Sequence, residues 1–313
     1  MKSLRRVLVV EIALLAMATL FPSALAQTQP GNKPRQRRPG SHSSPPRVTM
    51  SAEARAQLDQ AMVAVCTEQK LDPQSNIPID EMQARPSLPV HSPEAQLGLE
   101  RAQRVLPLAK TLMISALQQL ALEYGFEKSG RYRLRIEQAI IRVRSVRRVK
   151  PDMDSRDNAS VFLTRPHTIT FGTIFLAGLR SDEGMIGVLA HELMHIADGN
   201  TDSLRALVAA VSLKASALTG IDIRGQRAEE LTCDLIGAMA VRAYVADSPS
   251  YESVTRRLAR SIEHNCVDLD EGDDDHLSPR NTIRALLALH PVLVRELVFN
   301  RQERIQTRPT RDN

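Results

Sequence analysis

One short segment constrains the fold of this chain more than any other, because it must form a helix with two histidines on one side. Residues 181–199 open with the capping hydroxyl of Ser181 and two acidic residues and close with Gly199, which are typical signals of a helix start and end. Within this segment, His191 and His195 stand four residues apart, and such positions share one helix face. The residues around them are mainly apolar, which predicts that the rest of the helix is buried.

The two imidazoles are spaced to bind one metal ion. Neutral imidazole is a good ligand for Zn²⁺, which takes four ligands and in catalytic sites keeps one position for water. Glu192 directly follows the first histidine, so its carboxylate can approach that position and act as a general base. The sequence therefore predicts one zinc ion per chain, bound by His191 and His195. The alternative is a pair of surface histidines on a helix, and the apolar neighbours of the motif argue against it.

One further protein ligand is needed, and an acidic residue on a downstream helix can supply it. A histidine at position 201 would indicate a metzincin, but that residue is Thr201, which excludes the class. Glu230 and Asp234 lie one helical turn apart on one face. We expect Glu230 to bind the metal and Asp234 to accept the second N–H of a ligand histidine, which fixes its tautomer. The neighbouring Glu229 is interpreted as part of a solvated helix face.

These motifs resemble those of the gluzincin peptidases of the CAAX-prenyl-protease and HtpX type. That family combines an acid-rich helix start and Leu-Ala-His-Glu-x-x-His with a later helix carrying Arg-x-x-Glu-x-x-x-Asp. Here residues 181–195 match the first part, and Arg227, Glu230 and Asp234 match the second. The resemblance covers roughly residues 135–300. It implies a zincin-like fold and a zinc-dependent endopeptidase that acts on protein or peptide substrates.

The resemblance also implies how substrate is bound. In the family an Asn-Ala segment precedes an edge strand that pairs with the substrate backbone, and Asn158-Ala159 and residues 168–176 occupy the matching place. Two features depart from the family pattern. Asn200 stands where a further histidine is often found, and the membrane-spanning helices of the prenyl proteases are absent. The chain therefore resembles a soluble, exported member.

A C-terminal histidine, often followed by proline and arginine, helps to stabilise the oxyanion in this family. His290, followed by Pro291 and Arg295, has the matching residue types, and His276 has a matching position. The usual spacing fits neither histidine well. These residues are candidates for transition-state stabilisation, and the alternative for each histidine is a helix-capping or core role.

The pattern of the whole chain predicts an α+β fold that is mostly helical, with a small sheet beside a helical bundle. Helices are expected over residues 52–70, 92–124, 181–199, 202–218, 225–246 and 251–265, with a last pair opened by Pro279. A strand or helix edge is expected over 131–136, and strands over 140–149, 161–163 and 168–175.

The N-terminal end has the signals of export. A basic head, an apolar run and the small residues around Ala26 predict a secretory signal peptide over residues 1–26, cut after Ala26. The mature protein is then periplasmic or secreted. We expect a disordered Pro/Arg-rich linker over 27–50, a helical N-terminal region over 51–130, a metallopeptidase domain over 131–305 and a tail over 306–313.

Charge and aromatic content argue against nucleic acid as a partner. The net charge of the chain is +5, but residues 1–50 alone carry +7, so the remainder is slightly acidic. Only 3% of residues are aromatic, too few for base-stacking platforms. No segment after the signal is expected to span a membrane, although the arginines of the linker allow peripheral contact with one.

Three cysteines remain after the signal peptide, and export permits one disulfide. Cys233 lies within the helix of the expected metal site. We therefore expect the pair Cys66–Cys266, while the other pairings stay open.

The function expected from these residues is a zinc metalloendopeptidase that processes exported or envelope proteins. A second hypothesis is a zinc-stabilised, non-catalytic binding or chaperone-like module, which would not need Glu192. A third is a structural helical protein with a fortuitous motif, which requires that Glu230 lie far from both imidazoles.

Overall fold

Helices make up most of the structure, a computed structural model that describes residues 50–67, 74–162, 164–199, 204–267, 272–273 and 275–297. The predicted signal peptide and tail, the linker up to residue 49, Asn200 and Thr201 lie outside the described residues. All described residues belong to one compact unit, so the N-terminal helical region packs together with the C-terminal region that carries the motif.

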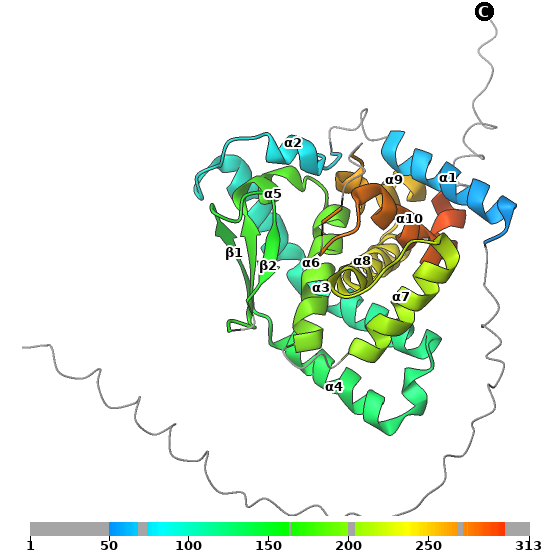
Figure 1. The fold of residues 1–313 in the computed structure, drawn as a ribbon. Coiled ribbons are helices and arrows are strands. Elements are labelled where there is room, and N and C mark those ends of the chain that lie inside the picture. Colours follow the sequence, from blue (N-terminus) through cyan, green and yellow to red (C-terminus); the bar gives the residue numbers. More distant parts are fainter. Residues whose placement is uncertain are drawn as a thin grey trace, which may run out of the picture. The chain divides into compact units, whose positions relative to one another are not determined.

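The elements follow one another from an N-terminal helical part through a small sheet to a C-terminal set of helices (Figure 1). The first part contains α1 (Ala52–Thr67), α2 (Ile79–Gln83), α3 (Pro93–Glu123), the 3-10 helix η2 (Phe126–Lys128) and α4 (Gly130–Ser145). The sheet and the helix after it are β1 (Arg148–Asp152), β2 (Ala159–Val161), β3 (Thr168–Gly172) and α5 (Thr173–Gly178). The last part contains α6 (Asp182–Asp198), α7 (Arg205–Thr219), α8 (Gln226–Asp247), α9 (Val254–Ala259), the 3-10 helix η4 (Glu263–Asn265), α10 (Pro279–Leu289) and a helical segment over 291–297. The α+β class predicted from the sequence is confirmed.

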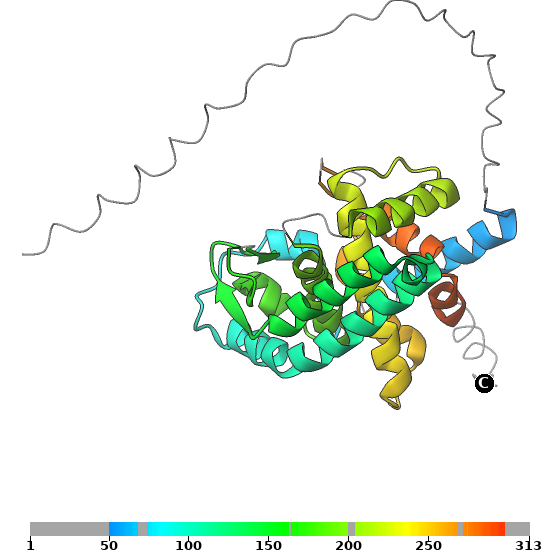
Figure 2. The same cartoon turned by 90° about the horizontal axis from the view of Figure 1, so that it is seen from below.

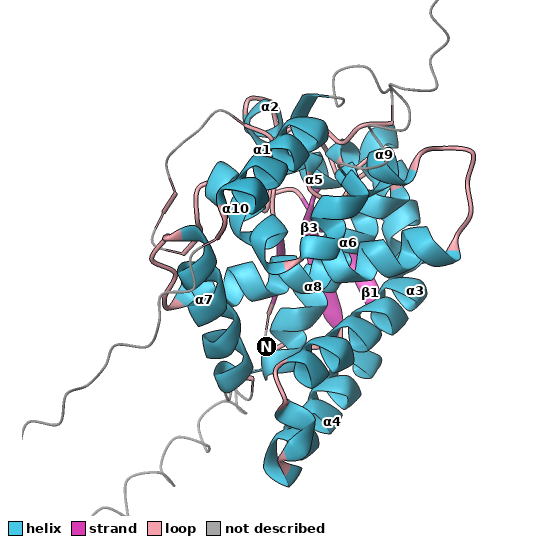
Figure 3. Cartoon of the chain, turned by 90° about the vertical axis from the view of Figure 1, so that its right-hand side faces the viewer, coloured by secondary structure: helices cyan, strands magenta, loops and turns pink. Residues whose placement is uncertain are grey.

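Helix α6 is the centre of the arrangement. It packs against α3 and α4, against α8 and against strand β2, so that Figures 1 and 3 show it between the sheet and the C-terminal helices. All its side chains are buried except three: Asp182 in the first turn, His191 and His195. The apolar pattern of residues 182–198 therefore produces a core helix in which the two histidines mark the only side left partly open.

The start of α6 is fixed by hydrogen bonds. The Ser181 hydroxyl accepts from the N–H of Gly184 at 3.0 Å, which is the cap that the sequence predicts. The side-chain oxygen of Asn76 accepts from the N–H groups of Arg180 and Ser181 at 2.9 and 3.2 Å. The N-terminal region thus holds the beginning of the helix that carries the motif.

Helices α6 and α8 approach each other closely because glycines stand at their crossing. A Cβ atom placed on Gly237 of α8 would lie 2.7 Å from the carbonyl oxygen of Gly187 of α6. A Cβ placed on Gly187 would meet its neighbours only at 3.5 Å and beyond, which is ordinary contact. Gly237 is therefore the residue that sets the separation of the two helices.

The sheet has the strand order β1-β3-β2, with β1 parallel and β2 antiparallel to β3. The interpretation of residues 168–176 as an edge strand is wrong, because β3 is the central strand and residues 173–178 form α5. Ile169 and Phe171 are fully buried, which suits a strand covered on both sides. Among the described residues β2 pairs on one side only, so the edge strand beside α6 is β2.

The strand expected over residues 140–149 is wrong except at its end, and residues 131–136, expected as a strand or helix edge, are helical, since residues 130–145 form α4. The arginines at 131, 133 and 135 alternate with apolar residues and imitate a strand pattern. Ala139, Ile140 and Val143 are the buried residues of this segment, and their spacing is that of a helix stripe. Packing of that stripe decides the conformation, and the strand begins only at Arg148.

Helix α3 is long and apolar enough to cross a membrane, which the sequence analysis did not expect of any segment after residue 26. Length and composition alone are weak evidence for a span, because a core helix passes the same test. Half of its apolar window is buried within the fold.

A disulfide joins Cys66 of α1 to Cys266, which follows η4, across 200 residues of sequence. This is the pair expected from the sequence. Cys233 is free and buried. The bond ties the N-terminal helix to the segment that lines one wall of the cleft described below.

The crossing of α6 and α8 gives a first prediction. We expect Gly237→Ala to destabilise the protein by about 1–3 kcal/mol, because the methyl group must push the helices apart. Gly187→Ala is the matched control and should be neutral or stabilising by up to about 1 kcal/mol, since alanine favours the helix. Urea unfolding measures both changes. Equal destabilisation by the two substitutions would contradict a separation set by Gly237.

Candidate metal centre

Three side-chain atoms from α6 and α8 converge at one point. The Nε2 atoms of His191 and His195 lie 3.2 Å apart. The Oε2 atom of Glu230 lies 3.2 Å from Nε2 of His191 and 3.5 Å from Nε2 of His195. The three atoms thus form a nearly equilateral triangle.

The triangle has the size that a tetrahedral zinc site requires. With Zn–N and Zn–O bonds of about 2.0–2.1 Å, tetrahedral geometry separates neighbouring ligand atoms by about 3.3–3.4 Å. The three separations observed here are 3.2, 3.2 and 3.5 Å. Two imidazoles and one carboxylate are also a common donor set of zinc sites that keep one position open. The residues therefore fit a single ion.

The opposite ring nitrogens of both histidines face carboxylates of α8. Nδ1 of His191 lies 2.8 Å from Oδ1 of Asp234, and Nδ1 of His195 lies 3.1 Å from Oε1 of Glu229. An N–H at Nδ1 that donates to the carboxylate leaves the lone pair of Nε2 free for a metal. One helix thus supplies both the acid within the triangle and the acids that orient the two imidazoles.

Cys233 also lies beside the histidines, and the donor atoms of His191, His195 and Cys233 all lie within 4.8 Å of one another. These three residues could hold a metal ion. The Cys233 thiol, however, is 3.7 Å from Nδ1 of His195, the nitrogen that faces Glu229, whereas Glu230 meets both histidines at Nε2. Burial raises the pKa of the thiol, which favours the protonated form. Geometry and charge both favour Glu230 over Cys233 as third ligand.

The charges within the cluster are strongly coupled. Burial lowers the pKa of His191, but its hydrogen bonds with Asp234 and Glu230 outweigh burial and raise that pKa well above its usual range. Burial raises the pKa of Glu230, and the two histidines outweigh it and lower that pKa far below its usual range. Glu230 is therefore ionised at neutral pH. Together with Asp234 and Glu229 it concentrates negative charge around the two imidazoles, which favours a cation.

Glu192 lines the same cleft with a side chain that is only 5% exposed. Burial raises the pKa of its carboxyl group, while the nearby histidines lower it. A carboxylate whose pKa is shifted upward toward neutral pH is a better proton acceptor in a general-base reaction. Glu192 thus lies in the same cleft as His191, and its role as general base stays a prediction.

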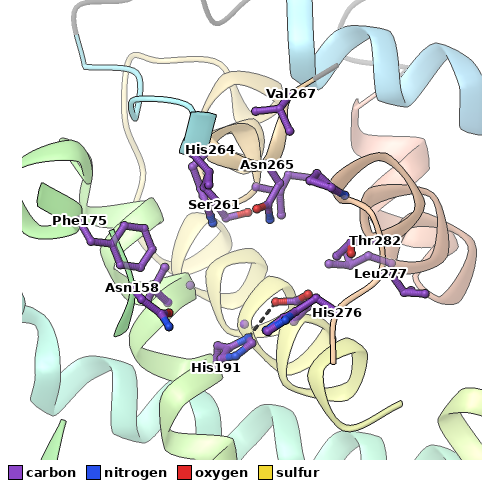
Figure 4. Close-up of a pocket in the computed structure, with 18 of the residues that line it drawn as sticks. Asn158, Phe175, His191, Ser261, His264, Asn265, Val267, His276, Leu277 and Thr282 are labelled. Atoms are coloured by element: carbon purple, nitrogen blue, oxygen red, sulfur yellow. Dashed lines mark hydrogen bonds and ion pairs between the residues drawn. The ribbon is translucent and has the colours of Figure 1, made fainter. Parts of the chain in front are cut away.

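A cleft of about 520 Å³ opens over His191 and Glu192. Figure 4 shows His191 at its base, with Asn158 and Phe175 on one side and His276, Leu277 and Thr282 on the other. The wall above is formed by the segment from Ser261 to Val267. The cleft thus brings together the turn before β2 and residues of α2, α5, α6, α8 and α10.

His264 is a cleft residue that the sequence analysis did not identify. It is 8% exposed and lies in edge contact with Phe175, with ring centroids 6.1 Å apart. Burial lowers the pKa of its imidazole to about 4, so the ring is neutral at neutral pH. Within the described residues its Nδ1 atom has no hydrogen-bond partner. Such a buried polar atom in a cleft wall is suited to meet a bound molecule or water.

The structure separates the C-terminal candidates. His276 lies in the cleft, with Nε2 3.8 Å from Oε2 of Glu230 and Nδ1 3.2 Å from Oδ1 of Asp273. His290 lies outside the residues that line the cleft, and its Nδ1 accepts a hydrogen bond from the N–H of Leu293 at 3.3 Å. His290 therefore caps the segment 291–297, the alternative role considered for it, and the exposed Arg295 belongs to that segment. Only His276 has a position from which it could assist chemistry.

Glu229 is the second residue that sequence reasoning missed. It was interpreted as part of a solvated face, but its carboxylate holds Nδ1 of His195. The available signal was the presence of acids on both sides of Glu230, at positions 229 and 234, on a helix expected to face two histidines. Two ligand imidazoles need two orienting carboxylates, and only Asp234 was predicted from the sequence.

Comparisons of this chain with protein-family models, with curated proteins and with solved structures find no match. The resemblance to gluzincin peptidases stays a prediction made from motifs. The motif residues His191, His195 and Glu230 nevertheless lie together, although 35 residues of sequence separate the last two.

The choice of third ligand can be tested directly. We expect Glu230→Gln to lose the zinc ion, because the amide oxygen is a much weaker ligand than the carboxylate. Cys233→Ser should keep one zinc per chain, since the thiol faces Nδ1 of His195. Metal analysis after dialysis measures both. Retention in Glu230→Gln together with loss in Cys233→Ser would show that the thiol is the ligand.

The orienting carboxylates give a further prediction. Asp234→Asn and Glu229→Gln should each weaken zinc affinity by about 10–100-fold, the usual effect of removing a partner of a ligand histidine. Asp247→Asn, at the exposed end of the same helix, removes the same charge and serves as control. Competition with a chelator measures the affinities. An equal loss in all three variants would indicate a general charge effect.

Proposed function

We propose that this protein is a zinc-dependent endopeptidase with a zincin-like fold, which hydrolyses peptide bonds in exported or envelope proteins. The observation that supports the proposal most is the triangle of His191, His195 and Glu230 at 3.2–3.5 Å, with Glu192 in the same cleft. The gluzincin resemblance, which rests on these same residues, agrees with the proposal. The export signal expected over residues 1–26 indicates the compartment.

Each residue of the cluster has a distinct role in this proposal. A bound zinc ion supplies a Lewis acid that polarises a carbonyl group and lowers the pKa of water. His191, His195 and Glu230 hold the ion, and Asp234 and Glu229 keep the two imidazoles in position. Glu192 takes a proton from the attacking water and returns it to the leaving amine, which fits its raised pKa.

The edge of β2 is the best candidate for binding the substrate backbone. Within the described chain β2 pairs only with β3, and Asn158, directly before it, lines the cleft. An extended peptide can add to such an edge through main-chain hydrogen bonds, while the cleft receives its side chains. The Asn-Ala part of the family pattern thus corresponds to β2, and residues 168–176 do not take that role.

His276 is the candidate for stabilising the transition state. It lies across the cleft from Asn158 in Figure 4, and its Nε2 is close to Glu230. An N–H at Nε2 in this position could donate a hydrogen bond to the oxyanion that develops on the substrate carbonyl. Asp273, at 3.2 Å from Nδ1, orients the ring.

Glu192→Gln tests the proposed reaction. The amide cannot accept the proton, so peptide cleavage should fall by about 10²–10⁴-fold while zinc content stays unchanged. Glu100→Gln, an exposed change on α3, is the matched control. A quenched fluorescent peptide library and metal analysis provide the two measurements. Cleavage by Glu192→Gln at the wild-type rate would contradict the role of Glu192, and zinc binding without cleavage by either protein would favour the non-catalytic binding module.

A further inference from the structure

Positive charge is concentrated in one short segment away from the metal-binding residues. Residues 128–150 contain nine lysines and arginines and one acidic residue, Glu137. The basic residues are Lys128, Arg131, Arg133, Arg135, Arg142, Arg144, Arg147, Arg148 and Lys150. Because the chain after residue 50 is slightly acidic as a whole, this segment is a local departure from its surroundings rather than a general property.

Helix α4, which forms most of this segment, has apolar residues on two faces. Ala139, Ile140 and Val143 are buried against the fold. Leu134 and Ile141 instead face outward, 55% and 65% exposed, and their spacing of seven residues places them on one side of the helix. A helix that packs on a core needs one apolar stripe, so packing within the described chain does not explain the second.

Arginines flank this outer apolar pair. Arg131, Arg133 and Arg144 are exposed on the same helix. Within the described part of the chain none of the three has an ion pair, in contrast to Arg104 and Arg242, which pair with carboxylates at 2.7 and 3.0 Å. We call Arg131, Arg133, Leu134, Ile141 and Arg144 the α4 outer face. The exposed Glu137 lies on the same side, between Leu134 and Ile141, so the face carries three arginines against one acid and has a net positive charge.

The α4 outer face lies at the periphery of the molecule. Figures 1 and 3 show α4 at the lower end, and the view from below in Figure 2 shows it at the front beside α3. The turn after β2 is fastened to the end of α4, because Nδ1 of His167 lies 3.0 Å from the carbonyl oxygen of Ser145. That turn adds the exposed residues Phe162 (51% exposed) and Arg165.

We propose that the α4 outer face docks the protein on an anionic phospholipid membrane surface. Leu134 and Ile141 enter the boundary between headgroups and acyl chains, while the arginines bind phosphate groups, the arrangement of an interfacial amphipathic helix. The phosphates of nucleic acid would pair with the arginines, but nucleic acid offers no apolar surface on which the exposed side chains of Leu134 and Ile141 can pack. The apolar centre therefore favours a bilayer. The proposal does not depend on the function of the metal centre.

Sedimentation of the mature chain, from residue 27 onward, with vesicles tests the docking. We expect binding to vesicles of phosphatidylcholine with about one quarter phosphatidylglycerol, weak binding to pure phosphatidylcholine, and loss of binding as salt shortens the electrostatic range. Each basic residue near an anionic membrane strengthens binding by about fivefold, so the triple change of Arg131, Arg133 and Arg144 to Gln should weaken it by on the order of a hundredfold.

Two matched controls separate this surface from general effects. Arg55, Arg280 and Arg295, changed together to Gln, remove the same charge from exposed positions on other helices and should keep binding within about fivefold. Leu134→Gln with Ile141→Gln should weaken vesicle binding about tenfold, because two apolar anchors are lost. Leu97→Gln with Leu213→Gln changes equally exposed leucines on α3 and α7 and should leave binding unchanged.

Several outcomes would overturn the proposal. Equal binding by wild type and the α4 triple variant would place the contact outside the α4 outer face. Binding to anionic vesicles that survives Leu134→Gln/Ile141→Gln, together with tighter binding to duplex DNA, would identify a general polyanion surface. Absence of binding to anionic vesicles at low salt would also reject a membrane surface as partner.

Discussion

The candidate metal centre depends on the close approach of α6 and α8 at Gly187 and Gly237. All the side chains that form it come from these two helices, and none of them can compensate for a shift of the other helix. Burial of nearly every other residue of α6 keeps that helix fixed on the core, so the approach of α8 decides whether Glu230 reaches the imidazoles. A contact between two glycines that line the same cleft, one helical turn before His191 on α6, thus controls the geometry of the chemistry.

The cluster also carries an electrostatic cost that a metal ion would relieve. Glu229, Glu230 and Asp234 lie near two half-buried imidazoles. Without a cation, protons on the imidazoles balance the negative charge of the carboxylates, which accounts for the raised pKa of His191. Partly buried charges are unfavourable unless each is paired. A divalent cation between Nε2, Nε2 and Oε2 would pair with the carboxylate and leave the Nδ1–H groups for the other two acids. Electrostatics and geometry therefore favour the same occupant.

The sequence predicted the parts of this structure that local signals specify. Ser181 and Gly199 fix the ends of α6, and helical spacing places His191 and His195 on one face. The sequence did not predict β3 as the central strand or α4 as a helix, because strand order and the choice between competing periodicities depend on packing with distant segments. Glu229 was missed for a related reason: an acid on a helix face is solvated or functional depending on what packs opposite, and only the fold places His195 there.

Helix α4 shows how one element can serve the fold and a surface at once. Its inner stripe packs on the core, and Nε of Arg142 donates to the carbonyl oxygen of Ala197 at 3.0 Å, which places a positive charge at the last turn of α6. The arginines that misled the strand prediction therefore divide into two groups. Arg142 stabilises the end of the helix that carries the motif, whereas Arg131, Arg133 and Arg144 contribute nothing visible to packing. Because fold stability does not constrain those outer positions, their charge and the exposed leucine and isoleucine beside them are better explained by a partner outside the chain.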